Sequence, residues 1–232
     1  MQRFLDIVLS GLALLLLSPL LIPVVIILCL TGEGEVFFTQ KRVGKGGGMF
    51  GVKKFATMLK DSPAMGTGTV TLKDDPRVLP FGKFLRKTKI NELPQLLNIF
   101  FGEMSVIGPR PQTQRCFDAF PDRSQAEIVK VAPGLSGLGS VVFRDEEEMM
   151  HAASDPDHVY DHLIMPYKGL LEEWYVANRG VGTYLQLIWL TVVALLKPDS
   201  DAVWRAFPDL PPPPPELRAG LNYPGGASRD AA

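Results

Sequence analysis

The apolar run near the N-terminus limits what this 232-residue chain can fold into more than any other feature. Between Phe4 and Leu30 the only charged side chain is Asp6. At about 1.5 Å rise per residue, a helix over this run is long enough to cross a hydrocarbon core of about 30 Å. Hydrophobic residues make up 46% of the chain, which excludes a disordered tail protein. The sequence therefore predicts a folded protein that associates with a membrane.

Two prolines interrupt this run. Pro19 and Pro23 each remove a backbone donor and clash with the preceding turn, so we expect a sharp membrane bend at Ser18 and Pro19. The Ser18 hydroxyl can satisfy a backbone group that Pro19 frees. Positive charge precedes and follows the run, so the positive-inside rule does not choose a direction. We predict a re-entrant helix with a Pro break over residues 1–31; a kinked single span is the alternative.

Charge is distributed unevenly along the chain. Residues 41–90 hold twelve Lys or Arg against three Asp, whereas residues 91–232 carry a net charge of −8. A cationic block after an apolar run is typical of a surface that faces anionic headgroups or phosphorylated ligands, and a solvated face is the alternative. We expect no nucleic-acid partner, because the apolar run and the acidic second half argue against one.

Residue patterning predicts an α+β fold that is mainly helical. A re-entrant membrane helix, a β-hairpin and interfacial amphipathic helices would surround a small cytosolic globular domain. We expect that domain over residues 32–200 and a disordered Pro-rich tail over residues 201–232. The expected elements are a hairpin over 35–55, a basic amphipathic helix over 81–89, helices over 90–100, 163–178 and 184–196, a short strand over 141–144, and an acidic helix start at 145–148.

Two short segments carry candidate binding residues. Asn91 and Glu92 lie at an expected helix start, where the partial positive charge favours carboxylates and phosphates; simple capping of the helix is the alternative. Pro109 and Pro111 flank Arg110 and restrict the backbone around it. A guanidinium held in this way suits bidentate phosphate recognition, and an ordinary Pro-rich turn is the alternative.

Several short motifs occur together in one order. They are Ser18-Pro19, Phe38-x-Gln40-x-Arg42-x-Gly44, Lys54-Phe55-Ala56-Thr57-Met58, Asp75-Pro76-Arg77-Val78, Leu85-Arg86-Lys87-Thr88, Glu92-Leu93-Pro94-Gln95-Leu96, Gly102-x-Met104-Ser105-x-x-Gly108-Pro109-Arg110-Pro111 and Pro133-Gly134-Leu135-Ser136-Gly137. With these motifs, roughly residues 1–200 resemble the bacterial sugar transferase family, the monotopic phosphoglycosyl transferases of small single-domain type.

The resemblance implies an enzyme that transfers a sugar phosphate from a nucleotide-diphosphate sugar, usually a UDP-sugar, to polyprenol phosphate with Mg²⁺. This is the first membrane step in assembly of capsule, O-antigen or exopolysaccharide, and it implies the cytoplasmic face of the bacterial inner membrane. The sequence leaves open a homodimer, the sugar and the nucleotide. The residues implied are Glu92 for catalysis and metal binding, and Arg110, Pro109, Pro111, Arg86, Lys54 and Gln95 for substrate binding.

The chain departs from the family pattern at the nucleophile. Family members typically carry Asp-Glu before Leu-Pro-Gln, with the Asp as covalent nucleophile, and here the pair is Asn91-Glu92. An amide is a poor nucleophile. Three hypotheses follow: Glu92 or another acid such as Asp145 attacks, the polyprenol phosphate attacks directly, or the chain is a non-catalytic membrane-associated binding protein of a glycan assembly complex. Ala56 replaces a usual Arg, and the segment 137–144 also differs.

Overall fold

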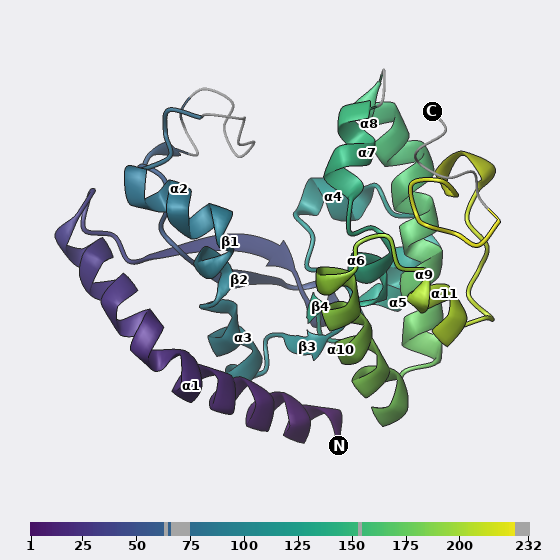
Figure 1. Cartoon of the computed structure of the whole chain (residues 1–232), viewed down its shortest axis with the longest axis horizontal. Coiled ribbons are helices and arrows are strands. Elements are labelled where there is room, and N and C mark those ends of the chain that lie inside the picture. Colours follow the sequence, from purple (N-terminus) through teal and green to yellow (C-terminus); the bar gives the residue numbers. More distant parts are fainter. Residues whose placement is uncertain (63–64, 66–74, 153–154, 226–232) are drawn as a thin grey trace. The chain divides into compact units, whose positions relative to one another are not determined.

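The computed structural model describes residues 1–62, 65, 75–152 and 155–225, and these residues form a mainly helical α+β structure (Figure 1). The helices are α1 (Gln2–Leu30), α2 (Pro80–Lys87), α3 (Gln95–Phe101), α4 (Gln114–Asp118), α5 (Asp122–Ile128), α6 (Leu138–Val142), α7 (Glu146–Ala152), α8 (Pro156–Val159), α9 (Met165–Ala177), α10 (Val181–Leu196) and α11 (Ala202–Ala206), with the short helices η1 (Lys45–Gly47), η3 (Ile90–Glu92), η4 (Tyr160–Ile164) and η5 (Pro215–Leu217). The strands are β1 (Phe37–Val43), β2 (Met49–Phe55), β3 (Ser105–Ile107) and β4 (Gly134–Ser136).

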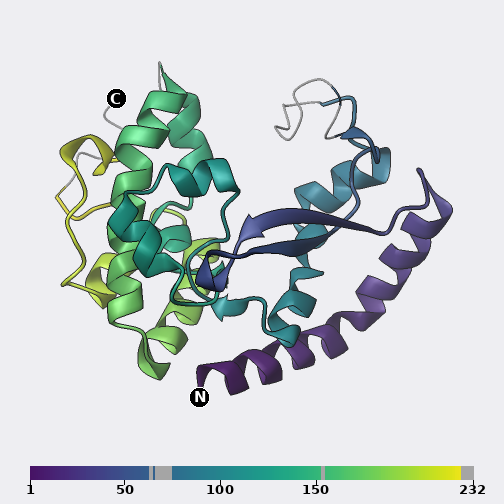
Figure 2. The ribbon, with the colours of Figure 1, turned by 180° about the vertical axis from the view of Figure 1, so that it is seen from behind.

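The chain divides into two compact units. Unit 1 comprises Met1–Phe4, Arg42–Phe50 and Gly102–Ala232, and unit 2 comprises Leu5–Lys41 and Gly51–Phe101. The predicted hairpin is confirmed as β1 and β2, joined through η1 (Figure 2). The predicted helices over 81–89, 163–178 and 184–196 are confirmed as α2, α9 and α10.

Helix α1 runs without interruption through Pro19 and Pro23, as a single curved ribbon (Figure 1). The expected division into two helices at Ser18 and Pro19 is therefore wrong for the helix itself. The Ser18 hydroxyl donates to the carbonyl of Leu15 at 2.7 Å, the carbonyl four residues before Pro19. This bond replaces the one that the missing proline N–H leaves unmade, so the helix continues.

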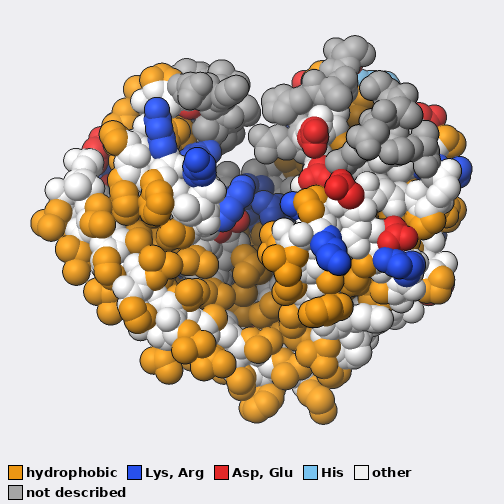
Figure 3. All heavy atoms as spheres, in the orientation of Figure 1, with side chains coloured by type: hydrophobic (Ala, Val, Ile, Leu, Met, Phe, Trp, Pro, Cys, Tyr) orange, Lys and Arg blue, Asp and Glu red, His pale blue; other side chains and the backbone are white. Residues whose placement is uncertain are grey.

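The outer surface of α1 is apolar. The helix is long and apolar enough to cross a membrane by length and composition, and only 11% of its most apolar window is buried. Leu15 and Leu16 are 70% and 69% exposed. Figure 3 shows hydrophobic side chains gathered over α1. Because soluble monomers rarely expose such long apolar stretches, this surface indicates association with a membrane.

Unit 2 packs the second half of α1 against the globular residues. Val24 and Leu28 of α1 form a buried cluster with Phe55 of β2 and Leu85 of α2. Farther toward the N-terminus, Gly11 meets the ring of Phe100, to which an added Cβ would approach within 3.3 Å. Helix α1 therefore contacts globular residues of unit 2 at both positions.

The β2 strand is fixed to α3 by one buried side chain. Asn98 is fully buried, accepts from the backbone N–H of Lys53 at 2.9 Å and donates to the carbonyl of Gly51 at 2.8 Å. Buried polar groups are generally hydrogen-bonded, and with both its amide groups bonded to β2, Asn98 sets the register of β2 against α3. The contact between β2 and α3 therefore also fixes where the residues after β2 lie.

Unit 1 is a helical assembly with a small parallel sheet. Its core includes Val43, Phe117, Phe120, Ile128 and Met165. Strands β3 and β4 pair in parallel, with Ser105 opposite Gly134 and Ile107 opposite Ser136.

Two expectations for unit 1 are corrected. Residues 141–144, expected as a short strand, instead contain the end of α6 and its C-cap, because Leu138 and Val142 lie one turn apart and are both buried. The expected helix start at the acidic cluster is confirmed, since α7 begins at Glu146.

The segment after α10 is ordered over residues 201–225, contrary to the expected disorder. Trp204 of α11 is 6% exposed and donates from Nε1 to the carbonyl of Leu221 at 3.0 Å. Tyr167 of α9 donates to the carbonyl of Pro211 at 2.7 Å. The apolar residues interspersed among the prolines dock onto unit 1, which composition alone does not reveal. Residues 226–232 lie outside the described part.

Candidate functional site

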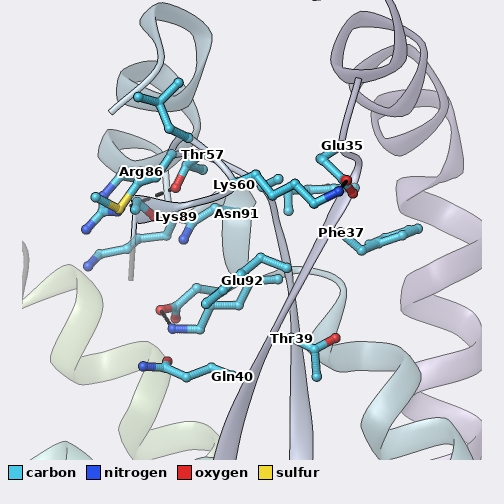
Figure 4. Close-up of a pocket in the computed structure, with 17 residues that line it drawn as sticks. Glu35, Phe37, Thr39, Gln40, Thr57, Lys60, Arg86, Lys89, Asn91 and Glu92 are labelled. Atoms are coloured by element: carbon cyan, nitrogen blue, oxygen red, sulfur yellow. Dashed lines mark hydrogen bonds and ion pairs between the residues drawn. The ribbon is translucent and has the colours of Figure 1, made fainter. Parts of the chain in front are cut away.

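A pocket of about 450 Å³ lies within unit 2 (Figure 4). Charged, polar and apolar side chains from β1, β2, α2 and η3 contribute to its walls. The lining residues are Glu35, Phe37, Phe38, Thr39, Gln40, Lys54, Phe55, Ala56, Thr57, Met58, Leu59, Lys60, Ser62, Arg86, Lys89, Asn91 and Glu92. Its volume is within the range of small-molecule sites.

Lys54 and Glu92 form an ion pair across the pocket. The distance from Lys54 Nζ to Glu92 Oε1 is 3.5 Å, and the two side chains are 21% and 27% exposed. Lys54 comes from β2 and Glu92 from η3, so the pair depends on how Asn98 fixes β2 to α3. The structure thus brings together two residues that the sequence singled out.

A second ion pair joins Lys60 and Glu35. The Nζ to Oε1 distance is 2.7 Å, and the backbone N–H of Lys60 also donates to the carboxylate of Glu33. The hydrogen bond and the charge of Glu35 raise the pKa of Lys60 above its ordinary value. These contacts tie the residues that follow α1 to the segment that follows β2.

Helix α2 brings Arg86 to the pocket because its backbone at Gly82 packs closely against the backbone of Thr57. Gly82 faces the carbonyl of Thr57, and an added Cβ would lie 2.2 Å from that oxygen. Only glycine permits this distance. The guanidinium of Arg86 then donates to Thr57 Oγ1 at 3.4 Å, and Arg86 lines the pocket.

The Asp75-Pro76-Arg77-Val78 motif supports the same wall. Arg77 and Asp75 are buried and bonded, with 2.6 Å between Nη2 and Oδ2. The guanidinium also donates to the carbonyl of Ser62, and the Arg77 carbonyl accepts from the N–H of Leu59. A buried ion pair with its remaining donors bonded holds a loop in one conformation. The motif therefore positions the pocket-lining residues 57–60 and 62.

Asn91 lines the pocket beside Glu92, in the 3₁₀ turn that precedes α3. Its Oδ1 atom is buried and has no hydrogen-bond partner among the described residues. Figure 4 shows Asn91 on the same side of the pocket as Arg86 and Lys89. A neutral amide leaves Glu92 and Glu35 as the carboxylates of the pocket, each bonded to a lysine.

The predicted Mg²⁺ is consistent with Glu92. Within the described ranges, no three Asp, Glu, His or Cys side chains group closely enough to hold a metal ion by themselves. Mg²⁺ in phosphoryl-transfer sites commonly takes one or two carboxylates and completes its shell with substrate phosphates and water. Glu92 is a half-buried carboxylate in a pocket that is rich in cations, so it can supply that one protein ligand.

The other predicted site residues do not line this pocket. Arg110, Pro109 and Pro111 belong to unit 1, where the Pro109 carbonyl accepts from the N–H of Gly134 and Arg110 is exposed. Their proposed role with Glu92 stays a prediction. Asp145 also belongs to unit 1. Gln95 is 6% exposed at the start of α3, where it contributes to packing.

Sequence reasoning missed three of the pocket's charged residues. Lys60 and Glu35 are far apart in the chain, and no local pattern predicts their pairing. Lys89 was read only as part of a basic helix, although α2 ends at Lys87 and Lys89 has a left-handed backbone with φ 58°. The Thr88-Lys89-Ile90 sequence carries no glycine that would signal such a turn.

The sequence of this chain is similar to those of known proteins. The sequence model described as bacterial sugar transferase matches residues 1–198. The UDP-glucose:undecaprenyl-phosphate glucose-1-phosphate transferase of Klebsiella pneumoniae is 38% identical over 196 residues, which are 82% of this chain and 39% of that protein. The exopolysaccharide production protein ExoY of Sinorhizobium fredii is 36% identical over 159 residues, 62% of this chain and 70% of that protein.

A third relative is a protein of Bacillus subtilis. The putative undecaprenyl-phosphate N-acetylgalactosaminyl 1-phosphate transferase of Bacillus subtilis is 39% identical over 140 residues, which are 60% of this chain and 73% of that protein. The matched relatives thus differ in length, and the chain spans well under half of the Klebsiella protein.

Proposed function

The chain belongs to the bacterial sugar transferase family, and from this premise we propose that it transfers a sugar phosphate from a nucleotide-diphosphate sugar to polyprenol phosphate. It is an enzyme of the phosphoglycosyl transferase type. The relatives named for their substrates act on undecaprenyl phosphate, and the Klebsiella enzyme acts on UDP-glucose. We therefore propose a UDP-sugar donor, an undecaprenyl-type acceptor and a role in making a surface polysaccharide.

The observation that carries the proposal is the excess positive charge in a pocket beside an apolar helix. Lys54, Lys60, Arg86 and Lys89 line the pocket against the carboxylates Glu35 and Glu92. Phosphoryl transfer needs charge neutralisation and positioning above all. Phe55, which also lines the pocket, packs against Val24 and Leu28 of α1, so a lipid-borne phosphate and a soluble donor can both reach the site.

We propose Glu92 as the carboxylate that binds the metal ion. Glu92 would hold Mg²⁺ together with phosphate oxygens of the donor, and the ion would neutralise the charge that develops on the leaving nucleotide. Lys54, 3.5 Å from Glu92, keeps that carboxylate in place. A single carboxylate engaged in this way is poorly available as a nucleophile.

The acceptor phosphate then attacks directly. A phosphate oxygen of polyprenol phosphate bonds to the β-phosphorus of the donor, and the bond from that phosphorus to the bridging oxygen breaks. The nucleoside monophosphate leaves with that oxygen, and the product is polyprenyl diphosphate sugar. No protein–phosphate bond forms, which agrees with an amide at Asn91. The step as proposed does not call on Asp145, whose role stays a prediction.

We propose that α1 enters one leaflet and that both its ends stay on one side of the membrane, the cytoplasmic face of the inner membrane. Contacts within unit 2 support this topology. Gly11 lies against Phe100 and Val24 against the cluster around Phe55, so α1 lies along globular residues over much of its length. A helix that crossed the bilayer would lose one set of these contacts. Its exposed leucines would face the acyl chains.

A panel assay tests the enzymatic proposal. Purified full-length protein is mixed with a set of UDP-sugars, undecaprenyl phosphate and Mg²⁺, and UMP release is measured with and without lipid. We expect release with at least one donor, only when lipid is present, and loss of release in Glu92→Gln. Intact-mass spectrometry distinguishes the routes, because a protein adduct of one sugar phosphate would contradict direct attack. Absence of UMP across the panel would favour the non-catalytic binding protein.

Topology has a separate test. Cys29 and Cys116 are first replaced. Two variants of this protein then carry one new cysteine each, before α1 or after it. Each is labelled with an impermeant maleimide in oriented vesicles. Equal labelling from the same side is the expected result. Labelling from opposite sides would establish a spanning helix instead.

A further inference from the structure

Of the four cationic side chains that line the pocket in unit 2, two are paired with a carboxylate in the part of the chain that the structure describes. Lys54 is paired with Glu92, and Lys60 with Glu35. Among the residues that the structure describes, the side chain of Arg86 donates one hydrogen bond, to the hydroxyl of Thr57 at 3.4 Å. The described lining residues therefore carry two more positive than negative charges. A pocket with this excess attracts an anionic ligand.

Lys89 contributes one of these charges through an unusual backbone. Its ammonium has no hydrogen bond or ion pair within the part of the chain that the structure describes, and its side chain lines the pocket. Its φ of 58° and ψ of 9° place it in the left-handed region directly after the C-cap of α2. Glycine or asparagine ordinarily occupies that position, because other side chains are strained there.

The turn at Lys89 also decides which residues face the pocket. The N–H of Lys89 donates to the carbonyl of Arg86, and the Lys89 carbonyl accepts from the N–H of Glu92. The turn thus ends α2 and starts η3, so that Arg86, Lys89 and Asn91 gather on one side of the pocket (Figure 4). All three side chains can donate hydrogen bonds to an oxyanion.

Asn91 takes part through its amide group. Its Oδ1 is buried, whereas the side chain as a whole is half-buried and lines the pocket. The group that remains for a ligand is the Nδ2 donor. A carboxylate at this position would neutralise one of the neighbouring cations, and the amide does not.

We propose that Arg86, Lys89 and Asn91 form an anion-binding cradle that holds the diphosphate of the donor, with Lys89 as a substrate-positioning residue. The proposal rests on the function proposed above, which supplies the diphosphate. Two cationic side chains and one amide match the charge and the acceptor oxygens of a diphosphate, while Glu92 remains for the metal. In this chain the residue before Glu92 therefore binds substrate oxygens as a neutral donor.

The competing explanation of Lys89 is a helix stop with no contact to substrate. The Lys89→Gly variant separates the two, because glycine suits the left-handed turn and removes the ammonium. If Lys89 only ends the helix, glycine improves the turn and changes nothing in binding. If Lys89 binds the anion, the variant is at least as stable as the wild type and binds the anion more weakly.

The test is calorimetric titration of the full-length protein in detergent micelles with inorganic pyrophosphate and with UDP, without Mg²⁺. We expect Lys89→Gly to weaken binding of both probes by about tenfold or more with an unchanged or higher Tm, and Lys89→Arg to retain most of the affinity. Lys83→Gln removes the same charge from an exposed position on α2 outside the pocket, and it should bind like the wild type.

Wild-type affinity for both probes in Lys89→Gly would overturn the cradle. Equal losses of affinity in Lys89→Gly and Lys83→Gln would also overturn it, because they would reflect only the overall electrostatic field of the protein. The panel assay is independent of this measurement. If the wild type releases no UMP but Lys89→Gly loses pyrophosphate binding, the proposed function fails and the cradle stands. If turnover is present and Lys89→Gly binds both probes normally, the cradle fails alone.

Discussion

The buried carboxyl of Glu172 predicts that unit 1 loses stability as the pH rises from about 4.5 to about 7. Glu172 of α9 is 2% exposed. Burial raises its pKa to about 7, although the ammonium of Lys168 and the N–H of Gly139 act in the opposite direction. Lys168 is itself bonded to Glu146 of α7 at 2.7 Å, so its charge is already compensated.

The sign follows from proton linkage. Below about pH 4.5 the carboxyl is protonated in both states and has no effect. Between that pH and about 7 the unfolded chain releases the proton while the folded chain keeps it, so stability falls as pH rises. The full effect is about 3 kcal/mol, at about 1.4 kcal/mol per pKa unit. For a domain of this size it corresponds to a Tm shift of about 6 to 12 °C.

The assay follows Tm by intrinsic fluorescence from pH 5 to pH 8 in one detergent. The wild type should lose several degrees across this range, and Glu172→Gln should lose markedly less, because a neutral amide keeps the Gly139 contact without ionising. Glu216→Gln, an exposed carboxyl of η5, serves as the matched control and should follow the wild type. Parallel curves for the wild type and Glu172→Gln would refute the reasoning.

Three further predictions follow from single contacts. Gly82→Ala places a Cβ 2.2 Å from the Thr57 carbonyl and should displace α2, lowering Tm and pyrophosphate affinity together; an unchanged Tm would contradict the close approach. Trp204→Ala removes a buried ring at a cost of about 3 kcal/mol or more and should expose residues 201–225 to limited proteolysis, so equal cleavage rates would speak against docking of that segment. Lys54→Met leaves Glu92 without its ion partner and should lower turnover in the panel assay at least about tenfold with little change in Tm, whereas wild-type turnover would remove the pair from the site.

Local patterns predicted the parts of the fold that depend on nearby residues. The basic amphipathic pattern of α2, the apolar run of α10 and the glycine-rich turn between two strand-like segments around η1 were sufficient to place those elements. Pro19 was expected to break α1, but one hydroxyl contact to Leu15 compensates the lost bond. Such compensation depends on geometry that the spacing of prolines does not contain.

The site was predictable to the extent that its residues lie in short motifs. Glu92, Lys54 and Arg86, which stand in such motifs, all line the pocket, while their roles in catalysis and binding stay predictions. Long-range pairing was not predictable, and the contact of Lys60 with Glu35 depends on how the end of α1 packs. Its many prolines made the tail look disordered, whereas a few apolar residues, among them the buried Trp204, hold residues 201–225 in place.

The most direct test of the central claim follows the sugar phosphate itself. Wild-type protein and Glu92→Gln are incubated with a UDP-sugar labelled in the sugar, undecaprenyl phosphate and Mg²⁺, and lipid and protein fractions are separated. We predict that the wild type places label in the lipid fraction as undecaprenyl diphosphate sugar, in equal amount to the UMP released, and none on the protein. Label on the protein, or UMP release without labelled lipid, would contradict direct transfer.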